Sequence, residues 1–395
     1  MFAKRTNWNL RPNPLAVALE EHRGAGKELL DLTASNPTTC GFRYDERAIL
    51  QALANPQALK YQPLAKGLLR AREAVAEYYA GLRRFAGNVV DAEAIFLTTS
   101  TSEAYSYLFR LLCDPEDELL VPAPSYPLFQ FLADLNEVTL VPYSLIYDHG
   151  WQMDFHSLPT ALTPRSKGVL VVHPNNPTGS FVKPNEAAAL STFCAQRDLA
   201  IIADEVFLDY ALDGCAHASF AGNDAALTFA LSGLSKIAAL PQMKMGWIAS
   251  SGPADLVQDA IARLEIIADT YLSQNTPVQL ATPDFLQQRA HVQAQIVERM
   301  RTNLAELDRQ LNVGGACRRL QVEGGWYAVL RVPITGSDEE LAIQLLLEKS
   351  VFVHPGHFYD FPSDGYLVVS LLTPVDEFRE GIRRTLQKIN AEDAE

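Results

Sequence analysis

Seven short apolar runs between residues 95 and 250 constrain the fold more than any other feature of this sequence. They lie at 95–99, 118–122, 139–144, 169–173, 199–204, 227–232 and 247–250. Several are apolar throughout instead of alternating with polar residues, which is typical of strands covered on both faces. Segments with helical spacing separate several of these runs. The pattern predicts an α/β fold with a mostly parallel, seven-stranded sheet and helices on both of its faces.

The pattern changes after Pro277. Residues 277–311 have the spacing of one long amphipathic helix, with Pro283 as its breaker. Strand-like runs at 324–333, 351–355 and 366–372 then alternate with helical segments near 338–348 and 375–389, which predicts a smaller α+β domain. We expect three parts: an N-terminal arm that also belongs to the small domain (1–50), a large domain (51–280) and the small C-terminal domain (281–395).

Charge and composition exclude several classes of partner. The chain has 33 Lys and Arg against 47 Asp and Glu, a net charge of −14, which argues against nucleic acid or an anionic membrane surface. Its apolar runs are far shorter than the ~20 residues of a membrane span. The segment 1–14 lacks the apolar core of a signal peptide, and the five cysteines form no C-x-x-C pair, so we expect a cytoplasmic protein with reduced thiols. The histidines show no metal-binding spacing, so no metal site is expected.

Polar motifs stand directly after four of the apolar runs, where ligands of open α/β sheets bind. The first, at 98–103, combines hydroxyl groups with a helix start, so it fits either an anion site or an ordinary N-cap. Within it, Ser100 and Glu103 have the spacing of a capping box. The second, at 173–179, reads HPNNPTG, and its prolines predict irregular backbone just past a strand.

The other two motifs place ionisable groups after apolar runs. Asp204 ends the run 199–204, where a buried carboxylate needs a cationic partner, although an N-cap role also fits. Lys236 ends the small-residue turn 232–236 and is either a surface cation or a desolvated amine of lowered pKa that can attack a carbonyl. Together, the four motifs supply an anion cradle, an amide, a carboxylate and a lysine, which are the groups that pyridoxal phosphate requires.

The order HPNNPTG, ADEVF and SGLSK resembles that of fold-type I pyridoxal-phosphate enzymes, namely the class I/II aminotransferases of the aspartate aminotransferase superfamily. The likeness runs from about Leu32 to Leu372. It implies a fold-type I transferase whose large domain binds pyridoxal 5'-phosphate. Lys236 resembles the lysine that forms the Schiff base and moves the Cα proton, and Asp204 resembles the carboxylate that keeps the pyridine nitrogen protonated.

The same resemblance implies further cofactor ligands. Asn176 resembles the amide on the ring hydroxyl oxygen, and Tyr126 resembles the aromatic residue stacked on the ring. The phosphate ligands would be Thr101, Ser102 and Ser235. Tyr61 resembles a tyrosine that reaches the phosphate in the neighbouring subunit, which implies a homodimer with shared active sites.

Three positions depart from the family's pattern. Phe207 stands where a tyrosine is usual, so one hydrogen bond to the ring oxygen is expected to be lost. Lys244 replaces an arginine on the phosphate and cannot form its bidentate fork. Val368 stands where an arginine normally binds the substrate carboxylate. Two explanations remain open: Arg43 binds that carboxylate instead, or the substrate has no free α-carboxylate at that place.

The resemblance implies ping-pong transfer of an amino group from an amino donor to a keto acceptor. Two alternatives use the same cofactor. One is a lyase or another reaction at Cα or Cβ, which the absence of an arginine at Val368 favours because orientation at Cα selects the reaction. The other is a cofactor-binding sensor without enzymatic activity.

Overall fold

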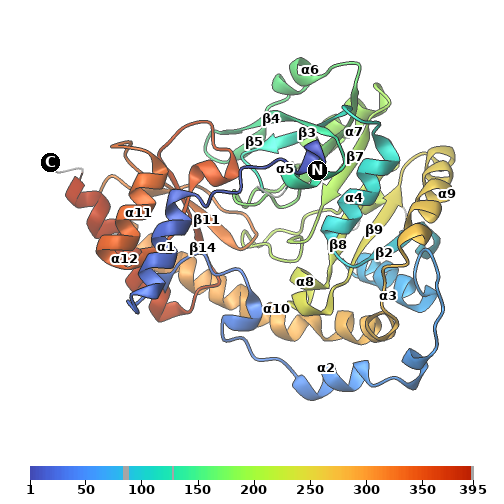
Figure 1. Ribbon diagram of the computed structural model, residues 1–395, viewed down its shortest axis with the longest axis horizontal. Helices are drawn as coiled ribbons and strands as arrows, with labels where there is room; N and C mark the ends of the chain where they lie inside the picture. The colour runs from blue at the N-terminus through green and yellow to red at the C-terminus, as the bar shows by residue number, and fades with distance from the viewer. Residues whose placement is uncertain (83–88, 127–128, 393–395) are drawn as a thin grey trace.

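The computed structural model describes residues 1–82, 89–126 and 129–392, and Figure 1 shows their arrangement. A large sheet covered by helices forms one part of the molecule. Helices α1 (Pro14–Gly24), α11 (Asp338–Lys349) and α12 (Val375–Glu392) gather in the other part. The long helix α10 (Thr276–Leu311) extends along both, because it packs against α3 (Leu69–Ala80) and α2 (Glu46–Leu53) as well as α12.

The large sheet has the strand order β2-β9-β8-β7-β6-β3-β4-β5. All seven strands expected from the apolar runs occur, and an eighth short strand, β5, pairs antiparallel with β4. Among the seven, only β9 runs opposite to the rest, so the sheet is mostly parallel. The strands are β2 (Ile95–Thr98), β3 (Glu118–Ala123), β4 (Thr139–Tyr147), β5 (Trp151–Met153), β6 (Ser166–Val172), β7 (Ala200–Asp204), β8 (Thr228–Gly233) and β9 (Gly246–Ser251).

Side chains of the central strands alternate between apolar cores on the two faces of the sheet. On β8, Phe229 and Leu231 belong to the core beneath α4 and α9, whereas Ala230 between them belongs to the core beneath α3 and α10. Because successive residues of a strand point to opposite faces, both faces must be covered, which explains the apolar runs without alternation. The covering helices are α4 (Thr101–Leu112), α5 (Phe129–Leu135), α6 (Ser157–Ala161), α7 (Pro184–Ala195), α8 (Leu234–Ile237) and α9 (Ala254–Tyr271).

A further core, separate from those of the large sheet, holds the N-terminal segment against the C-terminal part of the chain. Strand β1 (Leu30–Asp31) pairs parallel with β12 (Val351–Phe352), and Leu32 packs in the same core as Phe378. A four-stranded sheet of order β10-β11-β14-β13 completes this part. Its strands are β10 (Arg318–Arg319), β11 (Tyr327–Arg331), β13 (His354–Pro355) and β14 (Tyr366–Ser370).

Helix α10 confirms the long helix expected at 277–311. The side chain of Asn275 accepts a hydrogen bond from the Val278 N–H and caps its start, and the helix continues through Pro283 to Leu311. Short 3-10 turns link other elements, at Lys4–Thr6, Pro37–Thr39, Pro56–Leu59, Ala92–Ala94, Phe220–Gly222, Pro241–Met243 and Gly356–Tyr359. None of the helices in the described ranges combines the length and apolar character needed to cross a bilayer.

Candidate active site

Lys236 lies on α8, directly after β8, with its amine among aromatic rings. Its Nζ is 4.8 Å from the ring centroid of Trp326 and 5.6 Å from that of Phe207. Burial lowers the pKa of this amine to about 8, while the field of Asp204 acts in the opposite direction. The Tyr210 hydroxyl donates a 2.6 Å hydrogen bond to the Lys236 carbonyl oxygen and so holds the short helix in place.

Asp204 is the last residue of β7 and is buried. Its Oδ2 accepts a 2.8 Å hydrogen bond from the Tyr105 hydroxyl, and its Oδ1 accepts one of 3.1 Å from the Val206 N–H. Burial raises the pKa of this carboxyl, whereas the two hydrogen bonds and the charge of Lys236 act to lower it. The donors fix the direction in which the carboxylate points.

Glu205, the next residue, is also fully buried and was not singled out from the sequence. Its two oxygens accept hydrogen bonds of 2.6 Å from the Ser219 hydroxyl and from the Phe220 N–H. Burial raises the pKa of this carboxyl to about 8. Glu205 therefore fixes the 219–220 turn.

Asn176 belongs to the loop that follows β6. The neighbouring Asn175 organises this loop, because its Oδ1 accepts hydrogen bonds from the Thr178 hydroxyl (2.9 Å) and the Thr178 N–H (3.3 Å). The Asn176 side chain is buried, and its Oδ1 has no hydrogen-bond partner among the described residues. An unpartnered buried amide is costly unless a ligand or water satisfies it.

The N-terminus of α4 lies beside the start of β9. A Cβ atom placed on Gly246 would be 3.0 Å from the Ser100 carbonyl carbon and 3.1 Å from the Thr101 nitrogen, so any side chain here would crowd the start of α4. The first-turn N–H groups of Thr101 and Ser102 have no acceptor within a helix. Lys244 is exposed two residues before Gly246, and Ser235 is partly exposed on α8.

The capping box expected at this helix is only half right. The Ser100 hydroxyl accepts a hydrogen bond from the Glu103 N–H at 3.2 Å, as predicted. The Glu103 carboxylate instead accepts from the N–H of Thr99, at 2.7 Å, and from its hydroxyl. The Glu103 carboxylate therefore accepts from the N–H one residue before the N-cap residue Ser100.

Tyr126 is partly exposed, and its ring packs edge-on against Phe129 with centroids 5.8 Å apart. Burial and the charge of Asp204 raise the pKa of its hydroxyl to about 12, which places this residue within the electrostatic reach of Asp204. Tyr61 is 77% exposed and lines a different pocket, of about 180 Å³, together with Gln274 and Asn275. A single chain therefore does not bring Tyr61 to Lys236.

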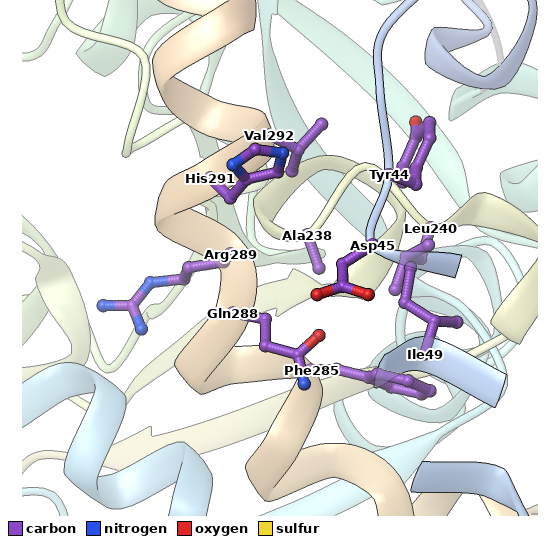
Figure 2. A pocket seen from close by; sticks show the side chains of 10 residues that line it. All are labelled: Tyr44, Asp45, Ile49, Ala238, Leu240, Phe285, Gln288, Arg289, His291 and Val292. Atoms are coloured by element: carbon purple, nitrogen blue, oxygen red, sulfur yellow. The ribbon is translucent and has the colours of Figure 1, made fainter. Parts of the chain in front are cut away.

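Arg43 lies on the surface of the N-terminal segment. Gln295 holds its backbone, accepting from the Arg43 N–H at 2.9 Å and donating to its carbonyl at 2.8 Å. The next residue, Tyr44, lines a pocket of about 320 Å³ between α2, α10 and the end of α8 (Figure 2). Neither Lys236 nor Asp204 contributes to that pocket.

Val368 lies in the middle of β14, between Val329 and His354 on the neighbouring strands. It is 1% exposed and belongs to the core of the C-terminal part. The aromatic residues around Lys236, Trp326 and Tyr210, were not predicted from the sequence. No local signal marks them, because they reach Lys236 from other parts of the chain.

Comparisons with known proteins identify the family. The model of the family described as aminotransferase class I and II matches residues 27–382. An alanine aminotransferase of Mycobacterium tuberculosis is 30% identical over 358 residues, which covers 87% of this chain and 81% of that protein. A glutamate-pyruvate aminotransferase of Escherichia coli is 27% identical and covers 92% of this chain and 90% of its own length.

Solved structures agree on the fold. An alanine aminotransferase from Pyrococcus furiosus superposes with a TM-score of 0.90 at 21% identity, covering 99% of this chain and 100% of that one. An Escherichia coli aminotransferase gives 0.87 at 23% identity and covers 98% of each chain. The curated relatives are named aminotransferases, so the lyase alternative is not favoured. This chain therefore belongs to the class I and II aminotransferase family, has the fold-type I architecture and is a transaminase.

Proposed function

We propose that this transaminase binds pyridoxal 5'-phosphate at the carboxyl edge of its large sheet, with Lys236 as the residue that attaches it. Three features of the chain support this cofactor. The buried Asn176 amide has an unpartnered oxygen, the N-terminus of α4 lies beside Gly246 where no side chain intervenes, and a carboxylate is held in place at Asp204. The residues proposed to hold the cofactor are Tyr61 of a second chain and Thr101, Ser102, Tyr126, Asn176, Asp204, Ser235, Lys236 and Lys244.

The bound cofactor would supply an electron sink for the negative charge that develops at the amine-bearing carbon of the substrate. Lys236 would accept and return a proton at Nζ. Its pKa of about 8 means that the neutral and the protonated amine are both populated near neutral pH. Such acid–base work typically contributes about 10²–10⁴-fold in rate. Asp204, oriented by Tyr105, would hold a proton at the ring nitrogen, and the aromatic rings would exclude water.

The position of the Lys236 amine at the end of β8, 4.8 Å from the Trp326 ring and 5.6 Å from the Phe207 ring, is the observation that carries this proposal. Borohydride treatment in the presence of pyridoxal phosphate should add the cofactor's mass to the peptide that contains Lys236. Lys236→Ala should abolish that adduct and transamination, whereas Lys167→Ala, which removes a lysine near the opposite end of the sheet, should change neither. A Lys236→Ala protein that still transaminates at the native rate would disprove the proposal.

The relatives' names suggest a substrate class. Because they are alanine and glutamate-pyruvate aminotransferases, we propose small amino acids as donors and 2-oxo acids as acceptors. Arg43 remains our candidate for the substrate carboxylate, since no acidic partner for its guanidinium is found in the described ranges. Arg43→Ala should then raise KM for alanine more than it lowers kcat. Unchanged turnover of amino acids would refute Arg43, and turnover of amines alone would favour donors without a free α-carboxylate.

We also propose a homodimer with shared active sites, in which Tyr61 completes the site of the other chain. Exposed apolar side chains near Tyr61 support this. Leu64 and Leu272 line the same pocket as Tyr61, and Leu59 lies two residues before it in the sequence. Light scattering should give twice the chain mass. Mixing inactive Lys236→Ala with a weakened Tyr61→Phe chain should restore one intact site per mixed dimer, and an absence of restored activity would contradict sharing. We also keep as a proposal the division of the chain into an N-terminal arm (1–50), a large domain (51–280) and a small domain (281–395).

A further inference from the structure

The segment 322–326, which leads into β11, lies between two loops of the large sheet. The N–H groups of Glu323 and Gly324 donate to the Gly179 carbonyl at 3.2 and 2.9 Å, and the Gly325 N–H donates to the Tyr210 carbonyl at 3.0 Å. The Leu212 N–H donates to the Glu323 carbonyl at 2.7 Å. The 322–326 segment is thus bonded on both sides, and its position depends on the loops after β6 and β7.

Glycine makes this close approach possible. A Cβ atom on Gly324 would lie 2.7 Å from the Tyr210 carbonyl oxygen and 2.7 Å from the Phe181 ring. A Cβ atom on Gly179 would lie 2.5 Å from the Gly324 carbonyl oxygen. The Tyr210 and Gly324 carbonyl oxygens are backbone atoms, so no side-chain rotation could relieve the contacts with them. The close approach of these backbones therefore requires glycine at 179 and 324.

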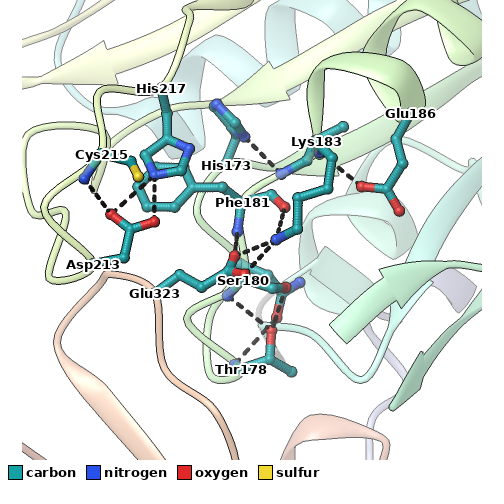
Figure 3. A network of polar contacts seen from close by, with 12 residues as sticks. His173, Thr178, Ser180, Phe181, Lys183, Glu186, Asp213, Cys215, His217 and Glu323 are labelled. Atoms are coloured by element: carbon teal, nitrogen blue, oxygen red, sulfur yellow. Dashed lines mark hydrogen bonds and ion pairs between the residues drawn. The ribbon is translucent and has the colours of Figure 1, made fainter. Parts of the chain in front are cut away.

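An ion pair between buried Glu323 and the partly exposed Lys183 also holds this segment. The Glu323 carboxylate, 8% exposed as a residue, accepts a 2.8 Å hydrogen bond from the Phe181 N–H and forms an ion pair with the Lys183 amine. Lys183 also donates to the Phe181 carbonyl at 3.0 Å. Figure 3 shows the two charged groups pointing toward each other beside Phe181. The lysine therefore links the loop after β6 to the 322–326 segment.

A second pair, His217 and Asp213, lies beside Phe181. The His217 ring stacks on Phe181 with centroids 3.5 Å apart, and its Nε2 is 3.0 Å from the Asp213 carboxylate (Figure 3). The Glu323 carboxylate thus accepts from the Phe181 N–H and from the Lys183 amine, and both donors belong to the loop after β6. These charge-assisted hydrogen bonds tie the 322–326 segment to that loop.

The segment ends at Trp326, which is fully buried. Its ring contacts Phe207 and Tyr210 edge-on, each with centroids 5.2 Å apart, and faces the Lys236 amine at 4.8 Å. Only two residues, Gly324 and Gly325, thus separate Glu323 from the ring that lies against the lysine. A shift of the 322–326 segment would move that ring and admit water to the amine.

We propose that the Lys183–Glu323 ion pair positions the 322–326 segment and thereby fixes Trp326 against the amine of Lys236. Glu323 and Lys183 are positioning residues: they act on Lys236 through Trp326 and touch no reacting atom. This inference rests on the proposed role of Lys236. The charged group whose field acts on that amine is Asp204, and the variants below leave it in place.

The test measures the Lys236 amine directly in the full-length protein after any bound pyridoxal phosphate has been removed. Competitive acetylation with isotope-labelled acetic anhydride, quantified by mass spectrometry on the peptide that contains Lys236, gives the pH at which this amine is half neutral. Glu323→Gln keeps the size of the side chain and an acceptor for the Phe181 N–H but removes the ion pair. It should raise the midpoint by roughly one pH unit, because Trp326 no longer excludes water from the ammonium form.

Glu118→Gln is the matched control. Glu118 is also buried and ion-paired, to Arg165 at 3.1 Å, but it lies at the first residue of β3, at the opposite end of the sheet. Its midpoint should equal that of the unaltered protein. Lys183→Arg, which retains the charge, should also keep the native midpoint. If Glu323→Gln does not fold, Lys183→Gln removes the same ion pair at its more exposed partner and should raise the midpoint in the same way.

Two outcomes would overturn the proposal. One is a native midpoint in folded Glu323→Gln and Lys183→Gln. The other is a shift that persists at full size when Glu323→Gln is added to Trp326→Leu, because an effect transmitted through Trp326 must vanish once that ring is absent. Either result is independent of whether Lys236 binds the cofactor, which the borohydride experiment decides separately.

Discussion

Gly246→Ala tests the proposed phosphate site at the N-terminus of α4. The new Cβ would lie 3.0 Å from the Ser100 carbonyl carbon, 3.1 Å from the Ser232 carbonyl oxygen and 3.1 Å from the Thr101 nitrogen. All three are backbone atoms, so α4 and β9 must separate by a few tenths of an ångström. Because a hydrogen bond to a charged group is worth about 1.5–3 kcal/mol, misaligning one N–H should weaken binding of the phosphate by about 10- to 150-fold.

The assay compares two ligands that differ only in the phosphate. Pyridoxal phosphate and pyridoxal are titrated into protein that also carries Lys236→Ala, so that only noncovalent binding is measured. Gly246→Ala should weaken the phosphorylated ligand and leave pyridoxal nearly unchanged. Gly24→Ala is the matched control, because a Cβ at that helix position meets no atom within 4 Å. An equal loss for both ligands, or no loss for either, would refute a phosphate site at this helix.

Two further substitutions test the surroundings of the site. Burial raises the pKa of Glu205 to about 8, so the folded protein keeps a proton that the unfolded chain releases near its ordinary value of 4.5. Stability should therefore fall by about 1.4 kcal/mol per pH unit between these values. Glu205→Gln should remove this fall. The melting temperature of the variant minus that of the native protein should therefore increase from pH 5 to pH 8, and a difference that stays constant would contradict the reasoning. Asn303 on α10 donates to the carbonyls of Leu371 (2.9 Å) and Thr373 (2.8 Å). Asn303→Ala should cost about 1–3 kcal/mol, and an unchanged melting temperature would disprove it.

Features that depend on neighbouring residues were predictable from the sequence. The strands of the large sheet and the helix 276–311 follow from periodicity and from caps such as Asn275, which act within a few residues. Strand β5 was missed because it has only three residues and alternates buried and exposed positions. The second half of the expected capping box failed because the residue types do not show whether the Glu103 carboxylate bonds the N–H of Ser100 or that of Thr99.

Contacts that join distant parts of the chain were not predictable in the same way. Tyr105 and Asp204 are 99 residues apart, and Lys183 and Glu323 are 140 apart, yet each pair is in contact. One sequence carries no signal of such pairings, because they depend on how the sheet and the loops pack. The motifs at the strand ends could be expected to meet only because parallel strands share one carboxyl edge.

The single reversed strand explains how a cation and a helix start can meet at that edge. In a fully parallel sheet, the residues that precede a strand lie at the opposite edge, far from the ligands. Because β9 runs antiparallel to both neighbours, its first residue, Gly246, pairs with Gly233 at the end of β8 and with Thr98 at the end of β2. Lys244 is therefore delivered to the carboxyl edge by the chain that enters β9. The same reversal brings three backbones together at Gly246, so alanine at this position would crowd all three, and its effect on ligand binding tests the proposed phosphate site.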